Sequence, residues 1–182
     1  MNHSTVLALV SAVWVALELM VAIISRRSGV NHDRGSHTLL WMLLVATIFT
    51  GAFLRHQPLG QMPDLFWLGI ALIVIGMIIR ATAILTLRRF FTVQVKIQES
   101  HELIDSGIYK IVRHPSYTGA LVSFIGLGFA FGNWLSLAVV LAGALSGLGY
   151  RIHVEEAALT NHFGERYRAY AARTKRLIPG IY

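Results

Sequence analysis

The sequence predicts an all-α integral membrane protein with about five transmembrane helices and a cytoplasmic amphipathic C-terminal helix. Of its 182 residues, 55% are hydrophobic and only 14% are charged, and the mean hydropathy is +0.59. Charged residues make up about a quarter of an ordinary soluble domain. The charges also avoid long stretches of the chain, and the 16 Lys and Arg residues gather between these stretches. This arrangement is typical of proteins with several membrane-spanning helices.

The same composition excludes several other classes. Disordered chains have low hydropathy, and the absence of cysteine rules out a disulfide or cysteine-thiolate framework. The histidines are not spaced as a compact ligand pair, so we expect no metal site. The net charge of +7 fits membrane topology and contact with anionic lipid head groups. We therefore expect no nucleic-acid partner.

Three apolar stretches in the first half of the chain are candidate spans: residues 6–24, 39–54 and 65–87. They approach or reach the roughly 17–25 residues that cross a bilayer. Glu18 is the only charge in the first stretch and Arg80 the only charge in the third. Charges are costly in hydrocarbon, so both should face the bundle interior or an aqueous pocket. An ion pair between them is one arrangement that would satisfy this requirement.

The uncharged stretch 117–150 predicts a helical hairpin. As one helix, its roughly 34 residues would be about 51 Å long, too long for a single span. Gly132-Asn133 is a turn signal near the middle, so we expect two short arms, 117–131 and 134–149. Gly143 and Gly147 form a small-xxx-small pair on the second arm, which predicts close contact with a neighbouring helix.

An amphipathic helix is predicted over residues 154–172. Leu159, Phe163, Tyr167 and Tyr170 recur there at helical spacing, with charged residues between them. Gly164 is expected to weaken the helix locally. Such a helix would lie against the bundle or the membrane interface.

The basic residues also predict the orientation. With the N-terminus outside and the C-terminus in the cytoplasm, 14 of the 16 Lys and Arg residues lie on the inner side, as the positive-inside rule requires. The long polar segments 88–115 and 151–182 then face the cytoplasm, and we expect the functional site there. We accordingly divide the chain into N-terminal spans, residues 1–87, and a core, residues 88–182. In a prokaryote the membrane would be the cell (inner) membrane.

Two polar clusters could bind a small charged molecule. His114, Pro115, Ser116 and Tyr117 stand where the fourth span begins, and a helix N-terminus favours an anion. The alternative is an interfacial anchor loop in which Tyr109 and Tyr117 lie at head-group level.

Arg151 and Glu155 form the second cluster, four residues apart on one helical face. They either diverge toward an anionic and a cationic ligand group or form an exposed ion pair, worth about 0–1 kcal/mol. Spacing alone favours the exposed pair.

Three motifs together resemble the isoprenylcysteine carboxyl methyltransferase family, whose members are small membrane enzymes that use S-adenosyl-L-methionine. The resemblance covers about residues 90–170. The motifs are His101-Glu-Leu-Ile-Asp-Ser-Gly107-Ile-Tyr109, Arg113-His-Pro-Ser-Tyr117, and Glu155-Glu156 followed by Leu159, Phe163-Gly164 and Tyr167. Ile104 stands where the family usually has valine, and at His153-Val154 some relatives continue the acidic run.

The resemblance implies specific roles by position. Arg151 would bind the substrate carboxylate, and Arg151 and Glu155 would be the catalytic pair. The cofactor site would consist of Gln94, His101, Glu102, Leu103, Ile104, Tyr109, His114, Pro115, Ser116, Tyr117 and Glu155.

The reaction implied is methyl transfer from S-adenosyl-L-methionine to the carboxylate of an isoprenylcysteine-like lipidated substrate, either a small molecule or a protein. A carboxylate needs no deprotonation, so alignment and exclusion of water would suffice. A phosphatidylethanolamine-type N-methyltransferase is an alternative, but it would need a base such as His114 or Glu156. A non-catalytic membrane protein that binds lipid is a third hypothesis.

Overall fold

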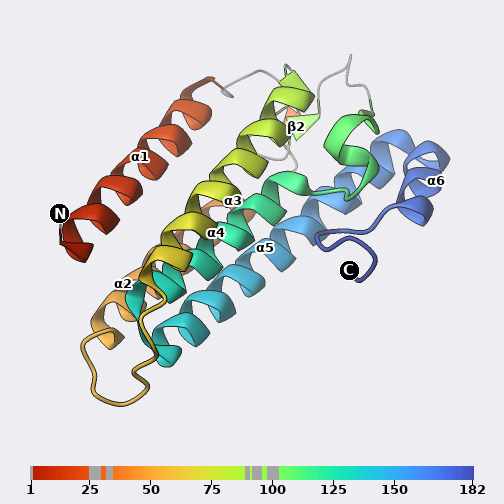
Figure 1. Ribbon diagram of the computed structural model, residues 1–182. Coiled ribbons are helices and arrows are strands. Elements are labelled where there is room, and N and C mark those ends of the chain that lie inside the picture. Colours follow the sequence, from red (N-terminus) through yellow and green to blue (C-terminus); the bar gives the residue numbers. More distant parts are fainter. Residues whose placement is uncertain (1, 25–29, 32–34, 89–90, 92–95, 98–102) are drawn as a thin grey trace.

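The computed structural model describes residues 2–24, 30–31, 35–88, 91, 96–97 and 103–182 (Figure 1). Its elements, in chain order, are α1 (His3–Ile24), β1 (Val30–Asn31), α2 (Ser36–Leu54), α3 (Phe66–Leu87), β2 (Lys96–Ile97), the 3-10 helix η2 (Gly107–Lys110), α4 (Pro115–Phe131), α5 (Trp134–Phe163) and α6 (Glu165–Arg173). Apart from the two-residue antiparallel pair β1–β2, the described elements are helices. The predicted all-α fold class is confirmed.

Within the described residues, three helices are long and apolar enough to cross a membrane: α1, α3 and α5. Two shorter apolar helices, α2 and α4, accompany them. Large apolar side chains on α1, α2 and α3 point outward, among them Ile23, Phe49 and Leu85. These outward residues suit a lipid environment, in which apolar side chains need no burial against protein. The number of five spans stays a prediction.

Pairs of glycines bring α3 and α4 into backbone contact. A Cβ added at Gly126 would lie 2.5 Å from the carbonyl oxygen of Gly69, and one added at Gly119 would lie 2.6 Å from that of Gly76. The helices are antiparallel neighbours (Figure 1), and small residues allow this close approach. The glycine pairs fix the register between the two helices.

Gly119→Ala should therefore destabilise the protein. The new Cβ would meet backbone atoms that cannot move aside, and overpacking of this kind costs about 1–3 kcal/mol. Gly149→Ala is the matched control, because no described residue packs within 4 Å of a Cβ at that helical position. We expect a lower unfolding temperature in detergent for Gly119→Ala and an unchanged or higher one for Gly149→Ala. Equal temperatures for the two variants would contradict the assigned contact.

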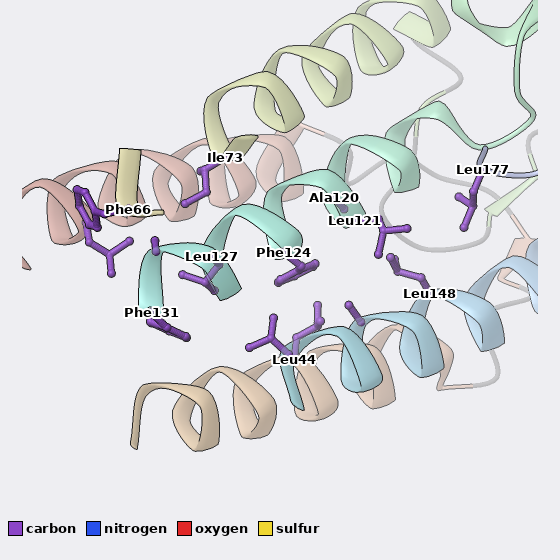
Figure 2. Close-up of a cluster of buried hydrophobic side chains, with 14 of the residues drawn as sticks. Leu44, Phe66, Ile73, Ala120, Leu121, Phe124, Leu127, Phe131, Leu148 and Leu177 are labelled. Carbon is purple, nitrogen blue, oxygen red and sulfur yellow. The ribbon is translucent and has the colours of Figure 1, made fainter. Parts of the chain in front are cut away.

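The predicted small-residue pair on the fifth span makes the expected contact. Gly143 and Gly147 of α5 face α2, where an added Cβ would collide with Thr47 and Leu40. Between the helices lies a core of buried apolar side chains (Figure 2). Its members include Leu44, Ile73, Phe124, Val140 and Leu148.

The predicted turn between the two hairpin arms is also confirmed. Gly132 ends α4 with φ 69°, a left-handed conformation that glycine adopts without strain. Asn133 is fully buried, and its side-chain oxygen accepts hydrogen bonds from the backbone N–H groups of Leu135 and Ser136. This is the expected role of an N-cap asparagine.

The structure differs from the sequence-based expectation at the C-terminal helix. We expected α5 to end near Gly149 and a separate amphipathic helix to begin at Val154. Instead, α5 continues to Phe163, and the break comes at Gly164, with φ 54°. Gly149 tolerates helical geometry, whereas Gly164 supplies the left-handed conformation needed for a turn. The amphipathic helix is the shorter α6, which buries Tyr167 and Tyr170.

Helices from both predicted units pack against each other. Helix α3 lies against α4, and α2 lies against α5. Elements on both sides of residue 88 therefore pack together in one bundle. The division of the chain into two units at residue 88 stays a prediction.

Candidate functional site

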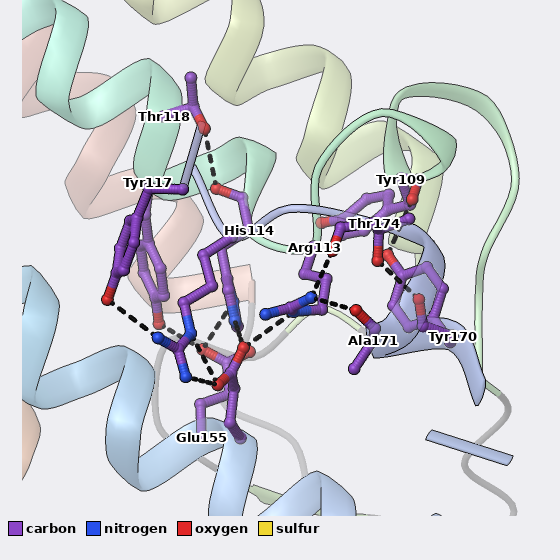
Figure 3. A network of polar contacts seen from close by, with 12 residues as sticks. Tyr109, Arg113, His114, Tyr117, Thr118, Glu155, Tyr170, Ala171 and Thr174 are labelled. Carbon is purple, nitrogen blue, oxygen red and sulfur yellow. Dashed lines mark hydrogen bonds and ion pairs between the residues drawn. The ribbon is translucent and has the colours of Figure 1, made fainter. Parts of the chain in front are cut away.

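Polar side chains gather at the end of the bundle where α4 begins and α5 leaves the apolar core (Figure 3). The chain places His114 as the N-cap of α4 and Pro115 at its first position. Proline suits this position because its fixed φ matches the helix and its missing N–H would have no partner there. The residue before proline is disfavoured in helical geometry, which leaves His114 at the mouth of the helix, as predicted.

Tyr117 connects the two charged residues of the second predicted cluster. Its hydroxyl donates a 2.6 Å hydrogen bond to Glu155 Oε2 and accepts a 3.2 Å hydrogen bond from Arg151 Nε. The side chain of Glu155 is 31% exposed, whereas Arg151 is only 2% exposed. The prediction of a solvent-exposed ion pair, which spacing alone favoured, is therefore wrong for Arg151, because this residue is buried.

Glu156 is the centre of an adjoining ionic network. Its Oε1 lies 2.9 Å from Arg113 Nε and 3.4 Å from His114 Nε2. Its Oε2 lies 3.0 Å from Arg176 Nε. The side chains of Arg113 and Glu156 are only 11% and 14% exposed. A carboxylate held by two arginines in this way stays ionised and hydrogen-bonded.

The C-terminal segment after α6 holds the His114 turn in place. Backbone N–H groups of Arg113 and His114 donate to the carbonyls of Lys175 and Arg176, at 2.7 and 3.0 Å. The Thr118 hydroxyl donates to the carbonyl of Leu177, at 2.8 Å. Arg113 Nη1 donates to the carbonyls of Ala171 and Thr174 as well. The turn is thus fixed by residues about 60 positions further along the chain.

Three buried tyrosines lie beside this network: Tyr109 on η2, and Tyr167 and Tyr170 on α6. Tyr170 donates to the carbonyl of Tyr109, at 2.8 Å, and burial raises the pKa of Tyr170 to about 12. Burial, together with Glu155, also raises the pKa of Tyr109. Both phenols therefore remain protonated and act as donors throughout the physiological pH range.

Tyr167 has an unusual environment. The residue is only 3% exposed, yet its hydroxyl has no hydrogen-bond partner among the described residues. Burial and the nearby carboxylates of Glu156 and Glu155 raise its pKa. A buried hydroxyl without a partner is costly, so this atom is a candidate for contact with a ligand.

The structure brings together most of the predicted site residues that it describes. His114, Ser116, Tyr117, Arg151 and Glu155 meet at one end of the bundle. Tyr109 lies near Glu155 and Tyr117. Leu103 and Ile104 are half-buried in the segment before η2. Three predicted residues lie outside the described residues: Gln94, His101 and Glu102.

Sequence reasoning missed two arginines of the site. Arg113 stands in the quoted Arg113–Tyr117 motif and is a half-buried partner of Glu156, so its place beside His114 was an available signal. Arg176 lies beyond the motifs, and no pattern in the sequence marks it. Among the described residues, no group of three His, Asp or Glu is arranged to hold a metal ion. The absence of a metal stays a prediction.

Fold and site together define the class: an all-α protein of apolar helices, with a carboxylate–arginine site at one end of the bundle. The sequence model of the isoprenylcysteine carboxyl methyltransferase family matches residues 68–161. The chain belongs to this family.

Similar proteins support this assignment. The chain is 37% identical over 115 residues to protein-S-isoprenylcysteine O-methyltransferase B of Arabidopsis thaliana, covering 62% of this chain and 58% of the relative. It is 31% identical over 151 residues to protein-S-isoprenylcysteine O-methyltransferase of Tribolium castaneum, covering 80% and 54%. A solved structure of the eukaryotic intramembrane Ras methyltransferase of this family matches with a TM-score of 0.64 and 28% identity, over 78% of this chain and 52% of that one. The chain spans somewhat more than half the length of these relatives.

Proposed function

We propose that this protein transfers a methyl group from S-adenosyl-L-methionine to the carboxylate of an isoprenylcysteine-like lipidated substrate at the membrane. One observation carries the proposal: at the end of an apolar bundle, a buried arginine and a half-exposed carboxylate share a single tyrosine hydroxyl. The relatives named for isoprenylcysteine methylation support the choice of substrate class.

The donor set fits the proposed cofactor. S-adenosyl-L-methionine carries a cationic amino group and a carboxylate, and when bound it supplies a methyl group already activated by the sulfonium. The carboxylate of Glu155 would hold the amino group, and residues 114–117 would line the same site. The Tyr167 hydroxyl, which has no hydrogen-bond partner in the described part of the chain, offers a further hydrogen bond on the side of Glu155 and Glu156.

The protein's own residues would align and shield the reactants. Arg151 would bind the substrate carboxylate through two parallel hydrogen bonds, a geometry for which guanidinium is suited. The carboxylate needs no base, so the requirement is correct orientation away from water. The surrounding apolar helices provide such a site, which a lipid tail can reach from the bilayer.

The alternative N-methyltransferase reaction has less support. Its amine substrate would need a base, and Glu156 is held by Arg113 and Arg176. His114 lies between Glu155 and Glu156, with its ring nitrogens 3.8 and 3.4 Å from their carboxylate oxygens, so both nitrogens already face carboxylates. No observation favours amine methylation.

We further propose the topology that the basic residues predict, with the N-terminus outside and the site on the cytoplasmic side. The outward apolar side chains of α1–α3 support an integral membrane location. The cofactor would then enter from the cytoplasm and the lipid from the bilayer.

The decisive experiment is to incubate the purified protein with methyl-labelled S-adenosyl-L-methionine and a prenylcysteine analogue. We expect a labelled methyl ester that mild base hydrolyses. A parallel reaction with phosphatidylethanolamine should give no product. Label in the phospholipid, or in neither acceptor, would overturn the proposed function.

Tyr167→Phe should have opposite effects on stability and on binding. Removing a buried hydroxyl that lacks a partner among the described residues should leave the free protein as stable or raise its stability by about 1 kcal/mol. Binding of S-adenosyl-L-methionine should weaken several-fold. Tyr170→Phe is the matched control, because it breaks the bond to the Tyr109 carbonyl and should lower the unfolding temperature. A fall in stability for Tyr167→Phe with unchanged binding would contradict the ligand contact.

A further inference from the structure

Arg80 of α3 lies beside the first turn of α4. The antiparallel register fixed by the glycine pairs explains this position. Gly69, Ile73, Gly76 and Arg80 follow one another at helical spacing on α3, so Arg80 is one turn beyond the Gly76–Gly119 contact. A Cβ at Gly119 would lie 2.7 Å from the backbone nitrogen of Arg80. The next turn of α4, toward its N-terminus, contains Ser116.

Arg80 contacts Ser116 and Glu18 at the same time. Its Nη1 donates to the Ser116 hydroxyl at 2.7 Å and lies 3.4 Å from the Ser116 carbonyl oxygen. Its Nη2 donates to Glu18 Oε2 at 2.7 Å, and its Nε lies 2.5 Å from Glu18 Oε1. The ion pair between Glu18 and Arg80 that the sequence analysis considered is therefore present. The hydrogen bond from Arg80 to Ser116 connects this pair to the candidate site.

The physical environment makes this contact important. The side chains of Arg80 and Glu18 are 16% and 18% exposed, and they lie within helices long and apolar enough to span a membrane. In that setting each charge depends on the other, because an unpaired charge in hydrocarbon is costly. Glu18 thus fixes the direction of the Arg80 guanidinium. The planar guanidinium can bind Glu18 and Ser116 at the same time.

The first turn of α4 is consequently held from two sides. The C-terminal segment holds the backbone of Arg113 and His114, and Arg80 holds Ser116. The Ser116 hydroxyl oxygen accepts a hydrogen bond from Arg80, so the hydroxyl hydrogen points away from Arg80. The start of α4 cannot rotate without breaking this charge-assisted hydrogen bond.

We propose that Arg80 is a positioning residue that orders the first turn of α4 for cofactor binding, and that Glu18 on α1 keeps Arg80 in place. This inference rests on the proposed function, which makes residues 114–117 part of the cofactor site. Glu18 lies outside residues 68–161 matched by the family model. The proposal therefore gives the first helix of this chain an indirect role in the site, through Arg80.

The experiment measures S-adenosyl-L-methionine affinity by calorimetry on purified protein, without any methyl acceptor. The variants are Arg80→Met, Ser116→Ala, the double variant, and Glu18→Gln. Arg55→Met is the matched control, since Arg55 caps α2 at the other end of the bundle. Arg80→Lys is added because it keeps the charge facing Glu18 and so guards against a variant that fails to fold.

We expect Arg80→Met to weaken cofactor affinity about tenfold or more, as loss of a charge-assisted hydrogen bond does. The double variant should be no weaker than the weaker single variant, since Arg80 acts through Ser116. Arg80→Lys and Glu18→Gln should weaken affinity by smaller factors, and Arg55→Met should leave it unchanged. Each variant is also tested for thermal unfolding, and affinities are measured well below the unfolding temperature.

Two results would overturn the proposal. One is wild-type affinity in a folded Arg80→Met or Arg80→Lys protein, even if its unfolding temperature falls, because that marks a purely structural ion pair. The other is a double variant whose fold-loss of cofactor affinity equals the product of the fold-losses of Arg80→Met and Ser116→Ala, because the two residues would then act independently. Wild-type affinity in Glu18→Gln would remove Glu18 from the proposal. If the unmodified protein itself binds no S-adenosyl-L-methionine, the proposed function fails, which is a separate result.

Discussion

Replacing Arg151 by lysine is expected to lower methyl transfer roughly 100-fold or more, the scale of losing one oriented donor in an active site. Binding of S-adenosyl-L-methionine should change by no more than a few-fold. Arg151 is 2% exposed and donates from Nε to the Tyr117 hydroxyl. A guanidinium has five donors in a fixed plane, so it can keep this bond while orienting a carboxylate. The single ammonium of lysine cannot reproduce both geometries.

The measurement is a methyl-transfer assay with a prenylcysteine analogue, paired with calorimetric titration of the cofactor. Arg166→Lys is the matched control, because Arg166 is exposed on α6 and should tolerate the same change. If Arg151→Lys reduced transfer and cofactor binding by the same factor, Arg151 would belong to the cofactor site and its assignment to the acceptor would be wrong.

Helix positions and the mouth of the site could be predicted from local signals. Apolar runs near the length of a bilayer, the Gly132-Asn133 turn and the His114-Pro115 dipeptide each act over a few residues, and the structure has all of them. The end of α5 could not be predicted in the same way. Two glycines, Gly149 and Gly164, offered breaks, and only the second adopts a left-handed conformation.

The contacts that complete the site depend on tertiary packing. Arg176 reaches Glu156 because the segment after α6 folds back on the turn at His114, and no spacing rule predicts that path. The role of Arg80 likewise follows from the glycine register between α3 and α4. A sequence shows that an intramembrane arginine needs a partner, whereas the register decides which partners it meets.

Neighbouring carboxylates should give opposite results when each is changed to glutamine. Glu156→Gln should destabilise the fold by about 3 kcal/mol, because breaking a buried pair leaves the remaining charge without its partner. For a chain of this size that corresponds to roughly 6–12 °C in unfolding temperature. The loss arises mainly at Arg113, since Arg176 is 40% exposed and retains access to water.

Glu155→Gln should lower the unfolding temperature less than Glu156→Gln does, because the side-chain amide oxygen can still accept the hydrogen bond from Tyr117 and the side chain of Glu155 itself is 31% exposed. It should weaken S-adenosyl-L-methionine binding about tenfold or more, since the charge facing the cofactor amino group is lost. Thermal unfolding and calorimetry on the same two preparations measure both effects. The two residues are adjacent and both half-buried, so each variant serves as the control for the other. If Glu155→Gln unfolded as early as Glu156→Gln, or if Glu156→Gln alone lost cofactor affinity, the division into a ligand carboxylate and a structural carboxylate would be wrong.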